Sequence, residues 1–193
     1  MKKLSLWMLA AILTLCGSLM FTSCSLEDDP IVDPVEEPEE PQVTEPSVKA
    51  SMRYEEQKLT VYNIEYPSTD PLGEPVMLSA TITMGDEVNT ESPALGLVLN
   101  SHFSVFRADQ CPTRGYLDVE KMMVGSHLIT ISPDYYGFGC TEDKLQAYCI
   151  SHVNAQASVD ALLAAKKILS ELGIGWTDDV LYNIGYSQGA QTA

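Results

Sequence analysis

The stretch Gly185-Tyr186-Ser187-Gln188-Gly189 decides how this chain is interpreted. It follows a short apolar run and precedes a few residues that suit a helix. A strand, a sharp turn and a helix in this order form a nucleophile elbow, in which the serine stands clear of the sheet edge. The glycines remove side chains that would collide in the turn. The pattern predicts Ser187 as a nucleophile, with Gly185, Tyr186 and Gly189 shaping its turn. A glycine-rich structural turn is the alternative.

The N-terminus has the layout of an export signal. Two lysines precede a long apolar run, which ends in Phe-Thr-Ser-Cys at residues 21–24. A charged start, an apolar region and small residues before the cut are typical of a secretory signal peptide, which we assign to residues 1–23. The last four residues resemble a bacterial lipobox, although Phe21 stands where leucine is usual. This resemblance implies that Cys24 is lipidated and anchors the chain to a membrane. A retained spanning helix is the alternative, but the run is short for one.

Residues 24–49 are acidic and rich in proline. Too little apolar surface and too much like charge predict a disordered tether between the anchor and a domain over residues 50–193. The acidic run at residues 25–29 resembles the signal that sends lipoproteins of some Gram-negative lineages to the cell surface, and a solvated linker is the alternative reading. We expect a lipid-anchored protein of the bacterial outer membrane or cell surface, with the periplasm as the other location.

Composition excludes one class of partner. The chain has 27 acidic and 11 basic residues, for a formal net charge of −16, whereas binding to nucleic acid needs a basic footprint. It has no phosphate-binding glycine loop, and we predict no cofactor. Cys140, Cys149 and His152 are too irregularly placed to predict a metal site. In an oxidising compartment we expect one disulfide, which joins Cys111 to Cys140 or to Cys149.

The hydrophobic pattern of the domain predicts strands alternating with helices. Two β-rich segments joined by a turn-rich connection predict an antiparallel pair. The long helix is predicted to be capped by Gly173 and to bury a stripe made of Ala155, Val159, Leu162, Leu163 and Leu169. The predicted strands are residues 59–66, 76–84, 94–99, 127–132 and 180–184, the last of them central, and the predicted helices are residues 115–124 and 153–172. This order is typical of an α/β domain.

Three segments carry a resemblance to the α/β-hydrolase superfamily: residues 97–102, residues 132–139 and the elbow. The middle segment, Ser-Pro-Asp-Tyr-Tyr-Gly-Phe-Gly, resembles the stretch after the fourth strand of secretory lipases. Within the superfamily, the chain is similar to secretory lipase-like and prolyl-oligopeptidase-like serine esterases. The resemblance implies an α/β fold corresponding to the N-terminal half of an α/β-hydrolase, with a mostly parallel sheet and an antiparallel start. The domain is expected to be incomplete, because residues 50–193 end just after the elbow.

The same resemblance implies a chemistry. Ser187 would attack an ester carbonyl and form an acyl-enzyme. The backbone N–H groups of Gln188 and Phe103 would be the oxyanion donors, although Phe103 stands where glycine is common. The expected function is a carboxylic-ester hydrolase or lipase-like enzyme that acts on a small-molecule ester or a lipid.

All three histidines precede Ser187, whereas the order in this fold is serine, acid, histidine. We interpret His102 and Asp134 as bracing the loops that contain them, and His127 and His152 as ordinary structural residues. The catalytic acid and base are expected beyond the end of this sequence, so the 193-residue chain is expected to be inactive by itself. A non-catalytic surface lipoprotein that binds a glycan, lipid or protein is one alternative, and a peptidase of the prolyl oligopeptidase type is another.

Overall fold

The computed structural model of the protein describes residues 44–115 and 125–193. The predicted signal peptide, Cys24, most of the predicted tether and nearly all of the predicted helix at residues 115–124 lie outside the described residues. The described strands are β1 (Ser47–Tyr54), β2 (Leu59–Thr69), β3 (Pro75–Gly85), β4 (Leu97–Ser101), β5 (Ile129–Pro133) and β6 (Leu181–Gly185). The described helices are α3 (Ser151–Glu171) and α4 (Gln188–Thr192), with short 3-10 turns η1 (Ala108–Gln110) and η2 (Gly139–Thr141).

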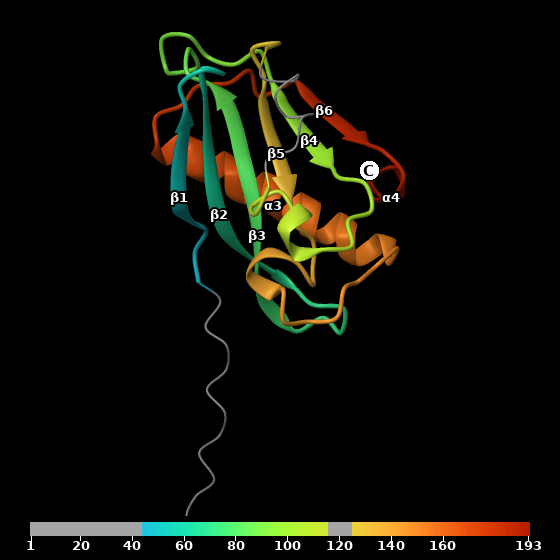
Figure 1. Cartoon of the computed structure of the whole chain (residues 1–193). Coiled ribbons are helices and arrows are strands. Elements are labelled where there is room, and N and C mark those ends of the chain that lie inside the picture. Colours follow the sequence, from blue (N-terminus) through green and yellow to red (C-terminus); the bar gives the residue numbers. More distant parts are fainter. Residues whose placement is uncertain (1–43, 116–124) are drawn as a thin grey trace, which may run out of the picture. The chain divides into compact units, whose positions relative to one another are not determined.

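The described strands form one mixed sheet in the order β1-β2-β3-β5-β4-β6 (Figure 1). Strands β1, β2, β3 and β5 pair in antiparallel fashion, and β5, β4 and β6 pair in parallel. The predicted α/β fold with an antiparallel start is therefore confirmed, and so is the antiparallel pair of β2 and β3. The prediction that residues 180–184 form a central strand is wrong for the described residues, in which β6 pairs only with β4 and lies at the edge of the sheet.

Helix α3 crosses one face of the sheet (Figure 1), and the main core lies between the two. The hydroxyl of Tyr66 in β2 donates a hydrogen bond to the carbonyl oxygen of Ala157 in α3 at 2.9 Å, which joins the two layers inside the core. Gly173 ends the helix as predicted, with φ 69°, and the N–H of Ile174 donates to the carbonyl of Leu169 at 2.9 Å. This is the geometry of a glycine-capped helix end.

The predicted buried stripe of α3 is only partly correct: Leu169 is buried and Leu162 packs against the core, but two other members are exposed. Leu163 is 61% exposed and Val159 is 48% exposed. The helix instead turns small residues toward the sheet, and its buried positions are Val153, Asn154, Ala157, Ser158, Ala161, Ala164, Ala165, Ile168 and Leu169. Small side chains let the helix approach the bulky residues of β2, β3 and β5. The size of a side chain, as well as its hydrophobicity, therefore determines which helix positions face the sheet.

Strand β1 has no counterpart among the predicted elements, and it begins slightly before the predicted domain boundary at residue 50. It is an exposed edge strand that pairs only with β2 among the described strands. The backbone pairing with β2 holds it there, and two surface ion pairs accompany that pairing: Lys49 contacts Glu65 at 3.0 Å, and Arg53 contacts Asp86 at 2.9 Å. Charged residues are typical of edge strands because they discourage further pairing, and they also remove the hydrophobic alternation that predicts a strand.

Candidate active site

The predicted elbow has the expected backbone. Strand β6 ends at Gly185, α4 begins at Gln188, and Ser187 between them has φ 57° and ψ −116°. A residue other than glycine rarely adopts such angles, because its Cβ meets the neighbouring backbone, and the strain is retained only where the surroundings fix it. Ser187 itself is exposed at this turn. The sequence pattern therefore predicted both the position of the turn and its strain.

The two glycines of the elbow have separate packing roles. A Cβ on Gly185 would collide with the carbonyl oxygen of Gly189 and would lie 2.8 Å from the backbone nitrogen of Ala190, so glycine lets the chain double back. A Cβ on Gly189 would collide with the carbonyl oxygen of Ser101 and would lie 2.8 Å from that of His102. Helix α4 therefore packs directly against the end of β4, and this contact brings the loop after β4 beside the serine.

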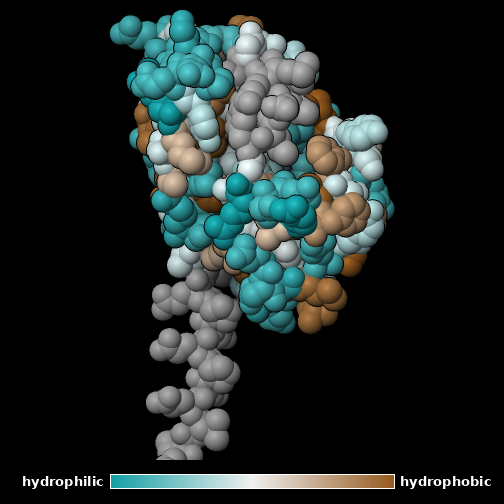
Figure 2. Space-filling model, viewed as in Figure 1, coloured by the Kyte–Doolittle hydropathy of each residue, from teal (hydrophilic) through white to brown (hydrophobic). Residues whose placement is uncertain are grey.

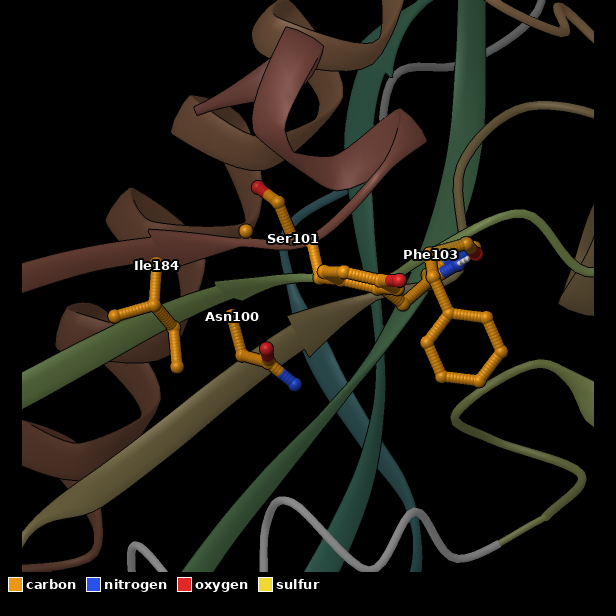
Figure 3. Close-up of a pocket in the computed structure, with 7 residues that line it drawn as sticks. Asn100, Ser101, Phe103 and Ile184 are labelled. Carbon is orange, nitrogen blue, oxygen red and sulfur yellow. Dashed lines mark hydrogen bonds between the residues drawn. The ribbon is translucent and has the colours of Figure 1, made fainter.

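A pocket of about 170 Å³ lies where β4 and β6 end (Figure 3). Figure 3 shows the side chains of Asn100 and Ile184 on one side of these strands and the hydroxyl of Ser101 on the other. The pocket is lined by Asn100, Ser101, His102, Phe103, Ile184, Gly185 and Tyr186. Pockets for drug-sized ligands are usually about 300–1,000 Å³, so this volume suits a small group. Ligand sites in parallel sheets lie outside the carboxyl ends of strands, as this one does.

The expected oxyanion donors lie on the two sides of the contact between β4 and α4. The N–H of Gln188 is the first of helix α4, and such N–H groups have no acceptor inside their helix. Phe103 is two residues beyond the end of β4 and lines the pocket. The positive end of a helix and a neighbouring loop N–H can together stabilise a developing negative charge. The roles of both residues remain predictions.

His102 is a buried bracing residue, as the sequence analysis expected. Its Nδ1 lies 2.6 Å from the carbonyl oxygen of Phe103, and its Nε2 lies 3.2 Å from the carbonyl oxygen of Asp134. The ring stacks on Tyr135, with 4.2 Å between ring centroids. Burial lowers the pKa of His102, against the opposing effect of the two carbonyls. A neutral imidazole has one N–H, so the ring donates a hydrogen bond to one of these two carbonyls at a time, and its tautomer decides which.

The other two histidines lie elsewhere. His127 has φ 57° in the turn before β5, with its Nε2 3.4 Å from the hydroxyl of Ser92 and its Nδ1 3.5 Å from Glu87. His152 is exposed in the first turn of α3. Both positions fit the structural roles expected of them. None of the three histidines, all of which lie in the described part of the chain, is hydrogen-bonded to Ser187.

Asp134 is the buried centre of a hydrogen-bond network. Its carboxylate accepts hydrogen bonds from the hydroxyls of Ser79 and Thr113, at 2.5 Å each, and from the N–H of Thr113 at 2.9 Å. The Ser79 hydroxyl also accepts the N–H of Cys140 at 3.1 Å. Burial raises the pKa of Asp134, and these hydrogen bonds oppose the shift. The predicted bracing role is confirmed. Ser79 and Thr113 gave no sequence signal, because single hydroxyl residues occur throughout a chain.

The expected disulfide is not formed among the described residues. Cys111, Cys140 and Cys149 are free thiols. The Cys111 thiol lies against the carbonyl oxygen of Ala108 at 3.1 Å, and the Cys140 thiol lies against that of Met77 at 3.2 Å. The predicted disulfide is therefore wrong for the described residues, in which the Cys111 thiol is buried whereas Cys140 and Cys149 are exposed.

Within residues 44–115 and 125–193, no group of three or more histidine, cysteine, aspartate or glutamate side chains is placed to hold a metal ion. No helix within the same residues is long and apolar enough to cross a membrane.

The strand order, the parallel strands β5, β4 and β6, and the elbow after β6 together define an α/β-hydrolase-like fold. No protein-family model and no curated protein sequence matches the chain. Solved structures do match it. One is a hydrolase from Legionella pneumophila, with a TM-score of 0.64, 22% identity, and coverage of 77% of this chain and 45% of that one.

Two further matches have the same fold. The rice cell wall degrading esterase LipA from Xanthomonas oryzae has a TM-score of 0.60 and 20% identity, over 81% of this chain and 44% of that one. Candida antarctica lipase A in its closed state has a TM-score of 0.53 and 16% identity, over 75% of this chain and 36% of that one. At these identities the likeness establishes the fold. The chain spans less than half the length of these structures.

Proposed function

We propose that this chain carries the nucleophile of a serine ester hydrolase, with Ser187 as the attacking residue. The observation that carries the proposal is the strained Ser187 backbone between β6 and α4, fixed by the contact of Gly189 with Ser101. Solved proteins of the same fold include an esterase and a lipase, which supports hydrolysis at this level.

The proposed reaction begins with attack of the Ser187 Oγ on the ester carbonyl carbon, while a general base takes the hydroxyl proton. The N–H groups of Gln188 and Phe103 stabilise the oxyanion. The alcohol leaves with a proton from the base, and water then attacks the acyl-enzyme to release the acid and free Ser187. We propose that the base and its acid partner come from polypeptide that follows the elbow.

The pocket supports binding of the carbonyl end of the acyl group at this site, because its volume is about 170 Å³. We further propose that the protein is exported and anchored by a lipid on Cys24, with the acidic tether of residues 24–49 holding the domain away from the membrane. The proposed substrates are esters or lipids of the cell envelope and its surroundings.

The test compares the 193-residue chain with a longer protein that includes the natural downstream reading frame. The longer protein is expected to hydrolyse 4-nitrophenyl acetate and butyrate, and Ser187→Ala to lower kcat by about 10⁴-fold or more. Ser170→Ala, at an exposed position of α3, is the matched control and is expected to keep full activity. Hydrolysis that survives Ser187→Ala would defeat the proposal. Faster turnover of a peptide 4-nitroanilide would favour the peptidase, and a longer protein with no turnover would favour the binding protein.

A further inference from the structure

Exposed apolar side chains gather on the loops that surround the elbow. Four of them are aromatic, and we call them the aromatic collar: Phe103 and Phe106 after β4, Tyr148 between β5 and α3, and Tyr186 after β6. Phe106 is 72% exposed, Tyr186 is 77% exposed and Tyr148 is 48% exposed. In Figure 2, brown and tan residues are frequent on the side of the domain where Figure 1 places α4 and the loop after β4.

The structure holds two of these rings together across two loops. The centroids of Phe106 and Tyr148 lie 6.1 Å apart, with ring planes inclined by 44°. The hydroxyls of Tyr148 and Ser104 lie 3.2 Å apart and hydrogen-bond to each other. Beside Tyr148, the carbonyl oxygen of Cys149 accepts a hydrogen bond from the Gln191 side chain of α4 at 3.3 Å. The loop that carries Tyr148 is thus tied both to the loop after β4 and to the elbow helix.

We propose that Phe106 and Tyr148 form a subsite for an aromatic ring in the acyl part of the ester substrate. This inference rests on the proposed function and names the substrate class of the same site. Phe106 is three residues beyond Phe103, whose N–H is the proposed oxyanion donor, so their Cα atoms are at most about 11 Å apart. An aromatic ring joined to the ester carbonyl by a short spacer spans a distance of this order.

The chemistry of the pair favours a ring over other ligands. Aromatic side chains prefer offset or edge-to-face contact with another ring, worth about 0.5–1.5 kcal/mol beyond the area buried. Tyr148 carries the single hydroxyl of the pair, and Ser104 already engages it, so the pair presents ring faces and few free hydrogen-bonding groups. An aromatic acyl group can use these faces through ring–ring contact alone, whereas a sugar would stack its C–H groups on them and would also need hydrogen-bond partners for its hydroxyls.

Binding to the Ser187→Ala protein tests the subsite without turnover. The probes are methyl 3-phenylpropanoate and methyl 3-cyclohexylpropanoate, which differ in the ring alone, and the Kd of each is measured by NMR titration. The aromatic ester is expected to bind about fivefold more tightly, within the range set by the ring–ring contact energy. Adding Phe106→Leu or Tyr148→Leu is expected to remove the preference. Tyr148→Phe keeps the aromatic ring and is expected to keep most of the preference for the aromatic ester.

Tyr182→Leu, at an exposed tyrosine of β6 outside the collar, is the matched control and is expected to change neither Kd. Equal binding of the two esters would overturn the subsite, and so would a preference that persists in both leucine variants. Tighter binding of methyl β-glucoside than of the aromatic ester would assign the collar to sugars instead. Ring-selective binding by a protein that never hydrolyses esters would defeat the proposed function and leave the subsite standing.

Discussion

The Cα of Gly189 lies so close to the carbonyl oxygen of Ser101 that no Cβ fits between them. This contact joins the first turn of α4 to the end of β4, and it sets the distance between the serine turn and the loop that begins at His102. The glycine therefore fixes how the two halves of the proposed oxyanion site meet.

Gly189→Ala is expected to destabilise the domain, because its Cβ would meet backbone that cannot rotate away. Overpacking of this kind costs about 3 kcal/mol. Gly73→Ala is the comparison: Gly73 has φ 88° and no neighbour near a Cβ, so only the backbone strain of about 1 kcal/mol applies. Urea unfolding measures both free energies. A Gly189→Ala loss no larger than that of Gly73→Ala would contradict the close approach.

Asp134 is expected to make stability depend on pH. Burial raises its folded pKa above the unfolded value of about 3.9. The contribution of Asp134 to the free energy of unfolding is therefore fully present below the unfolded pKa, and it is lost as pH rises through the folded pKa. Asp134→Asn does not titrate, and the hydroxyls of Ser79 and Thr113 can reverse to accept from its amide.

The measurement for Asp134 is the free energy of unfolding of both proteins from pH 3 upward. The native protein is expected to lose stability relative to Asp134→Asn as pH rises, by about 1.4 kcal/mol for each unit between the two pKa values. The opposite slope would mean that the hydrogen bonds outweigh burial and hold the carboxylate ionised.

The described thiols are expected to react with iodoacetamide at different rates. Cys149 is exposed, whereas burial, with Asp134 nearby, raises the pKa of Cys111 to about 11. Since the thiolate is the reactive form, Cys149 should be alkylated first at pH 8 and Cys111 last. Mass spectrometry of peptides from the native protein follows each site, and a denatured sample is the control in which all react. Early alkylation of Cys111, or a disulfide in the isolated domain, would refute this order.

Cys24 is expected to carry the lipid. In a Gram-negative host, the protein should incorporate labelled palmitate and partition into detergent, and Cys24→Ala should lose both properties. Cys16→Ala, which changes a cysteine inside the apolar run, should lose neither. A Cys24→Ala protein that is still labelled would show that the lipobox resemblance is misleading.

Sequence reasoning located the elbow, the antiparallel pair and the extent of α3, because each has a strong local signal. The turn needs glycine at Gly185 and Gly189, and a long helix shows its period. The local sequence did not predict features that tertiary packing determines, such as which face of a helix is buried. Part of the buried face of α3 was misassigned because Leu163 and Val159 suggest burial by themselves, whereas most of the helix positions that face the sheet hold small residues.

The network around Asp134 was only partly predictable. Its loop was recognised by resemblance, but its partners Ser79 and Thr113 lie far away in sequence and carry hydroxyls of a common kind. Strand β1 was missed because its side chains are mostly exposed and lack a hydrophobic alternation, and its pairing with β2 cannot be seen in the local sequence.

Asp134 connects two residues that do not line the pocket, Ser79 and Thr113, to the pocket-lining residue His102. Its carboxylate takes hydrogen bonds from Ser79 in β3 and from Thr113, and its carbonyl oxygen faces the His102 ring, whose other nitrogen lies against the carbonyl of Phe103. Natural variation should therefore be restricted at Ser79 and Thr113 as severely as in the elbow itself. The outer surface of α3, where Leu163 lies open to solvent, should drift freely between species.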